Sequence, residues 1–187
     1  MKHSFVCGNP ALDFAATVRS RLGTPLEMLS SPESLDDWFR ESGIIDGDTK
    51  CQRADLDEAI VMREAIYSLV HARVDGGDYD SDALSIVNDA ARTPPVVQQL
   101  TPLGRRTDGT PAQALSSVAR HAIEVLSGSD APLLKECANH ECTRVYIDRS
   151  RGARREWCAM DPCGNKMKAA AYRARKRADK PASVAGK

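Results

Sequence analysis

Four cysteines between residues 137 and 163 are the side chains in this sequence best suited to metal chemistry. They form two pairs, Cys137 with Cys142 and Cys158 with Cys163, with four residues inside each pair and fifteen between the pairs. Two short turns of this kind can place four thiolates around one tetrahedral zinc ion. Because sulfur would fill every position and leave none for water, the pattern predicts one structural zinc per chain and no hydrolytic site. Four unrelated buried thiols are the competing interpretation.

Two other assignments of these cysteines are disfavoured. The first six residues are too short and too polar for a secretory signal, so we expect reduced thiols in the cytosol rather than disulfides. His140 lies inside the first turn and could replace a thiol, but with four thiols available we expect it to be exposed and unligated. The remaining cysteines, Cys7 and Cys51, are isolated, and we expect both to be small buried groups.

A basic run follows the last cysteine. Residues 165–177 contain no Pro or Gly and are rich in Ala, Lys and Arg, which are strong helix formers. On a helix, Met167, Ala171, Ala174 and Ala178 fall on one narrow stripe that could lie against the zinc turn, with the cations on both flanks. The run could be only a solvated face. A helix that starts at a zinc ligand has a fixed direction, however, so its cations could act together on a polyanion.

The charge is divided between two parts of the chain. The 187 residues have a formal net charge of +0, from 26 Lys or Arg and 26 Asp or Glu. Residues 131–187 hold 14 basic and 6 acidic residues, a net of +8, and residues 1–130 hold 12 and 20, a net of −8. We therefore expect a body at 1–130, a metal-binding module at 131–180 and a frayed tail at 181–187.

The sequence contains no apolar run of ~18 residues, so no membrane span is predicted.

Periodicity predicts an α+β fold that is mainly α: a helical N-terminal domain with a small β-hairpin, followed by a small zinc-binding module that ends in the basic helix. Apolar residues at three- and four-residue steps, with caps and turn signals, predict helices over 31–42, 54–74, 81–91 and 111–126. The hairpin is expected at 96–106, and a hairpin or a strand and turn between the cysteine pairs, around 145–147. The segment after the Gly8-Asn9-Pro10 turn is predicted to be a helix or a short extended stretch.

Two charged residues stand in apolar settings. Asp13 lies between Leu12 and Phe14, and Arg63 interrupts the apolar stripe of the 54–74 helix. Such groups are normally paired or hydrogen-bonded. We expect Asp13 to be an N-cap or part of a buried ion pair, with an effector contact as the alternative. Asp13 or Glu64 could serve as the partner of Arg63.

The C-terminal third resembles the CGNR zinc finger family, which is named after the run at its last ligand. Here that run is Cys163-Gly164-Asn165-Lys166, and the wider match includes Cys137-Ala138-Asn139, Cys142, Asp148, Ser150, Arg154-Arg155, Trp157-Cys158-Ala159-Met160, Tyr172-Arg173 and Arg175. The resemblance implies zinc binding by the four cysteines and a DNA-binding role in bacterial transcription regulators.

The N-terminal two-thirds is similar to the ABATE domain, a stress-related sensor that accompanies this finger. The similarity rests on Gly8 through Thr17, with Ala11-Leu12-Asp13-Phe14 retained, and on Arg63 in its helix. There are two departures. Lys166 replaces the family arginine. Lysine keeps the positive charge but lacks the planar guanidinium group that binds phosphate or guanine through two hydrogen bonds. Ala16 stands where the family often has Asn, so a polar contact there is lost.

We expect a cytoplasmic, zinc-binding regulator that binds double-stranded DNA, with a body that dimerises or binds an unidentified small-molecule effector. If the protein contacts ~6 phosphates, its affinity for DNA should fall about a thousandfold as the salt concentration rises from 50 to 200 mM. An alternative is a protein-interaction module that docks an acidic partner of the transcription machinery. An enzyme or thiol redox switch is disfavoured, because no catalytic triad, phosphate loop or open metal site is visible. The candidate DNA-contacting residues are Arg149, Arg151, Arg154, Arg155, Lys166, Lys168, Arg173, Arg175 and Arg177.

Overall fold

The computed structural model describes residues 3–178 and contains α-helices and three two-stranded antiparallel sheets. In chain order the helices and strands are α1 (Pro10–Ala15), β1 (Val18–Arg19), β2 (Leu26–Glu27), α2 (Pro32–Glu41), α3 (Arg53–Asp75), α4 (Ser81–Arg92), β3 (Val97–Thr101), β4 (Gly104–Asp108), α5 (Pro111–Ser127), β5 (Leu134–Glu136), β6 (Val145–Ile147) and α6 (Asn165–Ala178). The predicted α+β, mainly α class is confirmed. Between residues 3 and 178, every helix is too short or too polar to cross a lipid bilayer.

The helices of the body begin where the sequence supplies a cap. Asn9 caps α1, Ser31 caps α2 and Thr110 caps α5, and in each case a proline occupies the first turn. The cap side chain accepts a hydrogen bond from a backbone N–H that the helix itself leaves unpaired, and proline suits a position that needs no N–H. The segment after Gly8 is thus helical from Pro10 onward, one of the two predicted alternatives.

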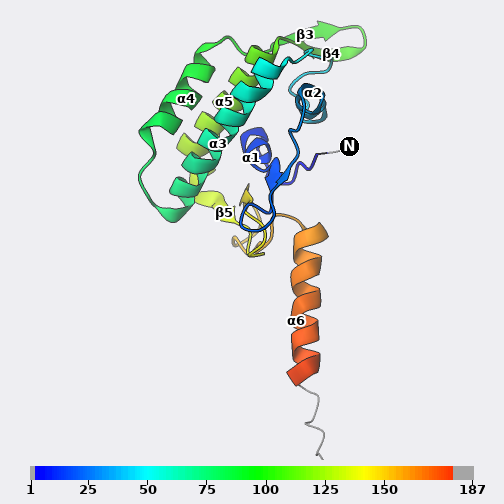
Figure 1. Ribbon diagram of the computed structural model, residues 1–187, viewed down its shortest axis with the longest axis vertical. Helices are drawn as coiled ribbons and strands as arrows, with labels where there is room; N and C mark the ends of the chain where they lie inside the picture. Colours follow the sequence, from blue (N-terminus) through cyan, green and yellow to red (C-terminus); the bar gives the residue numbers. More distant parts are fainter. Residues whose placement is uncertain (1–2, 179–187) are drawn as a thin grey trace, which may run out of the picture.

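Helices α3, α4 and α5 pack side by side, and the short α1 lies against α3 and α5 (Figure 1). The core beneath them is apolar and closely packed. Trp38 from α2 is completely buried and contacts Phe14 of α1 edge-on, with ring centroids 4.8 Å apart. Cys7 and Cys51 are buried, as predicted. The predicted hairpin is also confirmed, as the β3–β4 pair.

The C-terminal module is docked on the body. The N–H of Ile147 in β6 donates to the carbonyl of Cys7 (2.9 Å), and the Arg155 guanidinium donates to the carbonyl of Val6 (3.0 Å). One continuous apolar core includes residues of both parts, among them Val145 and Tyr146 of β6. The expected strand between the cysteine pairs is therefore present and holds the module in place. The predicted tail at 181–187 lies outside the described residues.

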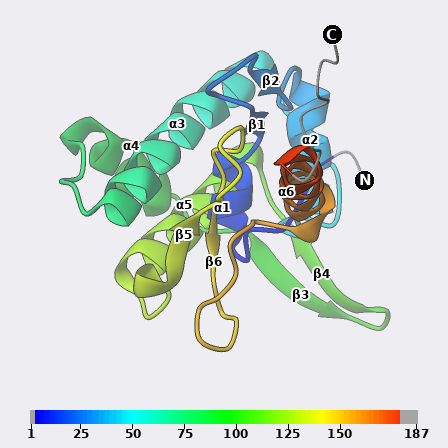
Figure 2. The same ribbon diagram turned by 90° about the horizontal axis from the view of Figure 1, so that it is seen from below.

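Helix α6 projects away from the rest of the molecule (Figures 1 and 2). The expectation that its alanine stripe lies against the zinc turn is wrong, because Ala171 and Ala174 are exposed and Met167 is half-buried. Three alanines and one methionine offer too little apolar area to hold a helix that carries six cations and no acid. The helix is consequently fixed at its N-terminal end alone.

Candidate metal centre and nucleic-acid interface

The four paired cysteines come together in one cluster. Cys137 follows β5, Cys142 ends the turn before β6, and Cys158 and Cys163 flank the short turn that leads into α6. Their sulfur atoms all lie within 4.8 Å of one another. The Cys142–Cys158 and Cys158–Cys163 sulfur separations are 3.8 and 3.7 Å.

These distances fit a metal tetrahedron. Four sulfurs at ~2.3 Å from a central zinc ion are about 3.8 Å apart, which is the spacing of the two measured pairs. Cys137, Cys158 and Cys163 are at most 5% exposed, and Cys142 is half-buried. His140 is exposed and is not part of the cluster. The cysteine cluster holds one structural zinc ion.

Polar groups around the sulfurs suit a negatively charged thiolate set. The amide of Asn139 donates to the sulfur of Cys163 (3.4 Å), and the backbone N–H of Cys158 donates to that of Cys137 (3.4 Å). The buried guanidinium of Arg144 lies 3.9 Å from the sulfur of Cys158. Four thiolates on a divalent ion carry a net charge of −2, so a buried cation and N–H donors lower the cost of keeping that charge in the interior.

The thiols also perturb one another. Hydrogen bonds from Cys142 and Cys158 lower the pKa of Cys137, and the bond with Cys137 raises the pKa of Cys158 to about 11. Metal binding requires all four thiolates, so zinc uptake releases protons and is weaker in acid.

Sequence reasoning did not single out Arg144. It stands two residues after a ligand and one before β6, and it is buried where Arg149, Arg151 and Arg154 are exposed. A basic residue beside a ligand, in a run that is otherwise apolar, is the signal that could have identified it.

A buried carboxylate shapes the 149–155 segment. One oxygen of Asp148 accepts from the N–H and hydroxyl of Ser150 (3.0 and 2.6 Å), and the other accepts from Lys135 (2.9 Å) and from the N–H of Arg155 (3.1 Å). The ammonium of Lys135 and the hydroxyl of Ser150 hold the pKa of Asp148 well below its usual range. Asp148 therefore stays ionised and closes the loop that carries the arginines.

The structure divides the nine candidate DNA-contacting cations. Some already have protein partners: Arg149 pairs with Asp130 (2.6 Å), and Lys166 pairs with Glu141. Arg155 donates to the carbonyls of Val6, Trp157 and Cys158 and stacks over Tyr146, so it ties the module to the body. Lys168 lies 5.8 Å from the Trp157 ring centroid.

The others are exposed, and no side-chain ion pair or hydrogen bond holds them within residues 3–178. These are Arg151 and Arg154 in the loop and Arg173, Arg175 and Arg177 on α6, to which the structure adds Lys176. The loop and α6 are separate projections when the molecule is seen from below (Figure 2). The free cations thus form two groups, of which the one on α6 is larger.

The start of α6 is fixed by close packing. A Cβ on Gly164 would lie 2.9 Å from the sulfur of Met160 and 3.2 Å from the Trp157 ring, so no larger residue fits without a shift. The N–H of Gly164 donates to the carbonyl of Ala159 (3.1 Å). Since Gly164 directly follows a zinc ligand, the metal centre and the first turn of α6 are one rigid unit.

Within residues 3–178, Asp13 is neither an N-cap nor an ion-pair partner. Its Oδ1 accepts from the N–H groups of Val6 and Cys7, both at 2.9 Å, and so ties the N-terminal segment to α1. Burial raises the pKa of Asp13, although the hydrogen bonds from these two N–H groups act to lower it. Because the same segment pairs with β6, Asp13 supports the docking of the zinc module.

Asp13→Ala is expected to lower the free energy of unfolding by roughly 2–4 kcal/mol, because two buried N–H groups lose their acceptor. The melting temperature should fall by about 5–15 °C. Asp13→Asn keeps an acceptor oxygen and should cause about half the loss. A thermal melt of the three proteins checks this, and an alanine variant that melts with the unaltered protein would contradict the assignment.

Arg63 lies in an ion-pair network. Within the described residues its partners are Glu27 (2.6 Å) and Glu64 (2.9 Å), so Glu64 is a partner as expected and Asp13 is not. Glu64 also pairs with Arg21, whose guanidinium stacks 4.0 Å over the Tyr67 ring. Burial alone would raise the pKa of Glu64, but the two arginines lower it. The network fastens β2 to α3 and leaves the Arg63 charge satisfied by protein groups.

Two family models match the chain. Residues 8–129 match the ABATE family, described as "Putative stress-induced transcription regulator", and residues 134–176 match the CGNR zinc finger. No curated protein matches the sequence. The first match spans more than half of the 187 residues, and the second contains all four clustered cysteines. The chain belongs to the ABATE family and carries a CGNR zinc finger.

Proposed function

We propose that this protein is a cytoplasmic transcription regulator that binds double-stranded DNA through α6. The observation that carries the proposal is the placement of this helix, which projects from the zinc centre with six cations and no acid. Four of them, Arg173, Arg175, Lys176 and Arg177, have no protein partner within residues 3–178 and are free to hold phosphates. Regulator and zinc finger family matches support the same function.

The dimensions suit the DNA major groove. A 14-residue helix is about 21 Å long, and the groove is ~12 Å wide, which admits one α-helix. The acidic body is held away from the helix, so its net charge of −8 acts on the DNA only at a distance that salt largely screens. Arg151 and Arg154 would reach a neighbouring stretch of backbone.

Lys166 has a different role in this proposal. Its ammonium is paired with Glu141, and the side chain lies at the base of α6 rather than on its free end. A lysine there offers a point charge without a planar fork. We therefore assign it to fixing the helix rather than to reading a base.

Genomic footprinting with the purified, zinc-loaded chain tests the proposal. The expected result is a set of enriched duplex sites that disappear in the Cys163→Ser variant. Sites that survive in the variant would break the link between the metal and the helix. The absence of any enriched duplex at moderate salt would favour the alternative of an acidic protein partner.

A further inference from the structure

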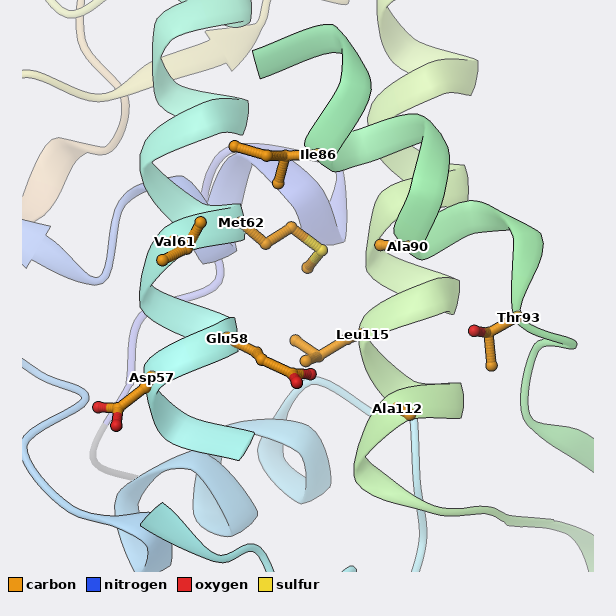
Figure 3. A pocket seen from close by; sticks show the side chains of 9 residues that line it. All are labelled: Asp57, Glu58, Val61, Met62, Ile86, Ala90, Thr93, Ala112 and Leu115. Carbon is orange, nitrogen blue, oxygen red and sulfur yellow. The ribbon is translucent and has the colours of Figure 1, made fainter. Parts of the chain in front are cut away.

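The body contains a cavity far along the chain from the zinc centre. It has a volume of about 430 Å³ and lies among α3, α4 and α5 (Figure 3). Its wall is mostly apolar and is formed by Val61, Met62, Ile86, Ala90 and Leu115, with Ala112 and Thr93 at one end. Cavities of about 300–1,000 Å³ with an apolar lining and a few polar groups are typical small-molecule sites.

Among the described residues, two acids are the only charged ones in this lining, and they differ in their surroundings. Asp57 pairs with Arg53 at 3.0 Å, one helical turn earlier, and its side chain points away from Leu115 (Figure 3). Glu58 extends toward Leu115, across the space between α3 and α5 (Figure 3). Within residues 3–178 no ion pair or hydrogen bond holds the Glu58 carboxylate. A carboxylate without a partner beside an apolar cavity is a place for a ligand cation.

Among residues 3–178, no Lys or Arg forms part of the cavity wall. Arginines that contact wall residues are already engaged: Arg53 pairs with Asp57, and Arg120 donates to the carbonyl oxygens of Ala91 and Thr93. Helix α4, which forms one side of the cavity, carries Asp82, Asp89 and Arg92, and Arg92 is paired with Asp89. An apolar molecule with a carboxylate would place like charges together and lose affinity. Charge and shape therefore select one class of ligand.

We propose that this cavity binds an apolar organic cation, with its hydrocarbon part against Met62 and Leu115 and its ammonium group on Glu58. The proposal goes beyond the proposed function: it takes up the expectation that the body binds a small-molecule effector, and it names the class of effector. Ligand binding is measured on the protein without DNA, so its failure and a failure of DNA binding are separate results.

Three probes with one carbon skeleton test the charge requirement: 4,4-diphenylbutylamine, 4,4-diphenylbutanol and 4,4-diphenylbutanoic acid. The amine is protonated at pH 7. Titration calorimetry with the full zinc-loaded chain should give a dissociation constant for the amine on the order of 100 μM. The alcohol should bind at least about fivefold more weakly, and the acid more weakly still.

Glu58→Gln should remove the preference for the amine over the alcohol while the alcohol binds as before. Asp57→Asn is the matched control, since its carboxylate is paired and turned away, and it should keep the preference. Ala112→Trp lies at an exposed end of the cavity, so it should fold and block all three probes. No binding of the amine, equal binding of amine and alcohol, or a preference that survives Glu58→Gln would each overturn the proposal.

Discussion

Replacing Cys163 by serine is expected to remove the zinc ion and to unfold the module around it. Zinc binding by four thiolates supplies ~10–16 kcal/mol in isolated zinc fingers. The module has few apolar residues of its own, mainly Val145, Tyr146 and Ile147 of the short β6. Loss of one ligand should weaken zinc binding on the order of a thousandfold or more, and α6 should lose its fixed direction.

Zinc content by mass spectrometry and a competition assay with a chelator measure this effect. Cys51→Ser is the matched control, because Cys51 is also a buried cysteine but lies in the body, outside the cluster. It should keep one zinc per chain. A Cys163→Ser protein that holds zinc as tightly as the unaltered chain would show that the sulfurs do not share an ion.

Removal of the four unpaired cations of α6 is expected to have the second large effect. The variant carries alanine at 173, 175, 176 and 177, and alanine preserves the helix because it has the highest helix propensity. Each phosphate contact adds about −0.9 to the slope of log affinity against log salt. The slope should therefore become less steep by about 3.6, and affinity at low salt should fall on the order of a hundredfold or more.

A second variant separates helix contacts from net charge. It loses four cations from the body instead, at positions occupied by Arg53, Arg73, Arg92 and Arg105. The exposed ion pairs made by Arg53 and Arg92 contribute little to stability, so this chain should fold. Fluorescence anisotropy across 50–200 mM salt should show a nearly unchanged slope for the body variant. Equal losses in both variants would mean that only overall charge matters.

Local signals in the sequence predict much of this fold. Ser31 followed by proline, and Pro111, mark two helix starts that the structure reproduces. Gly76 ends α3 in the left-handed conformation, as the Gly-Gly pair indicates. The cysteine spacing predicts the metal cluster because two tight turns and one short strand leave few other ways to bring four thiols together.

Long-range contacts were not predictable in this way. Asp13 accepts from two backbone N–H groups, and no side-chain pattern reveals which backbone segment will approach a carboxylate. Arg155 and Arg149 look like free cations in the sequence, yet carbonyls and Asp130 hold them. The alanine stripe of α6 has helical periodicity but too little area to dock, and periodicity does not measure area.

Photo-crosslinking from α6 tests the central claim most directly. A photoreactive phenylalanine analogue replaces Tyr172, which is 60% exposed on α6, or, as the control, Tyr79, which is 37% exposed on the body between α3 and α4. With zinc bound, the label at 172 should crosslink to duplex DNA and the label at 79 should not; chelation of the zinc should abolish the crosslink. Crosslinks from position 79 alone, or undiminished crosslinks from 172 after zinc removal, would contradict a helix aimed at DNA by the metal centre.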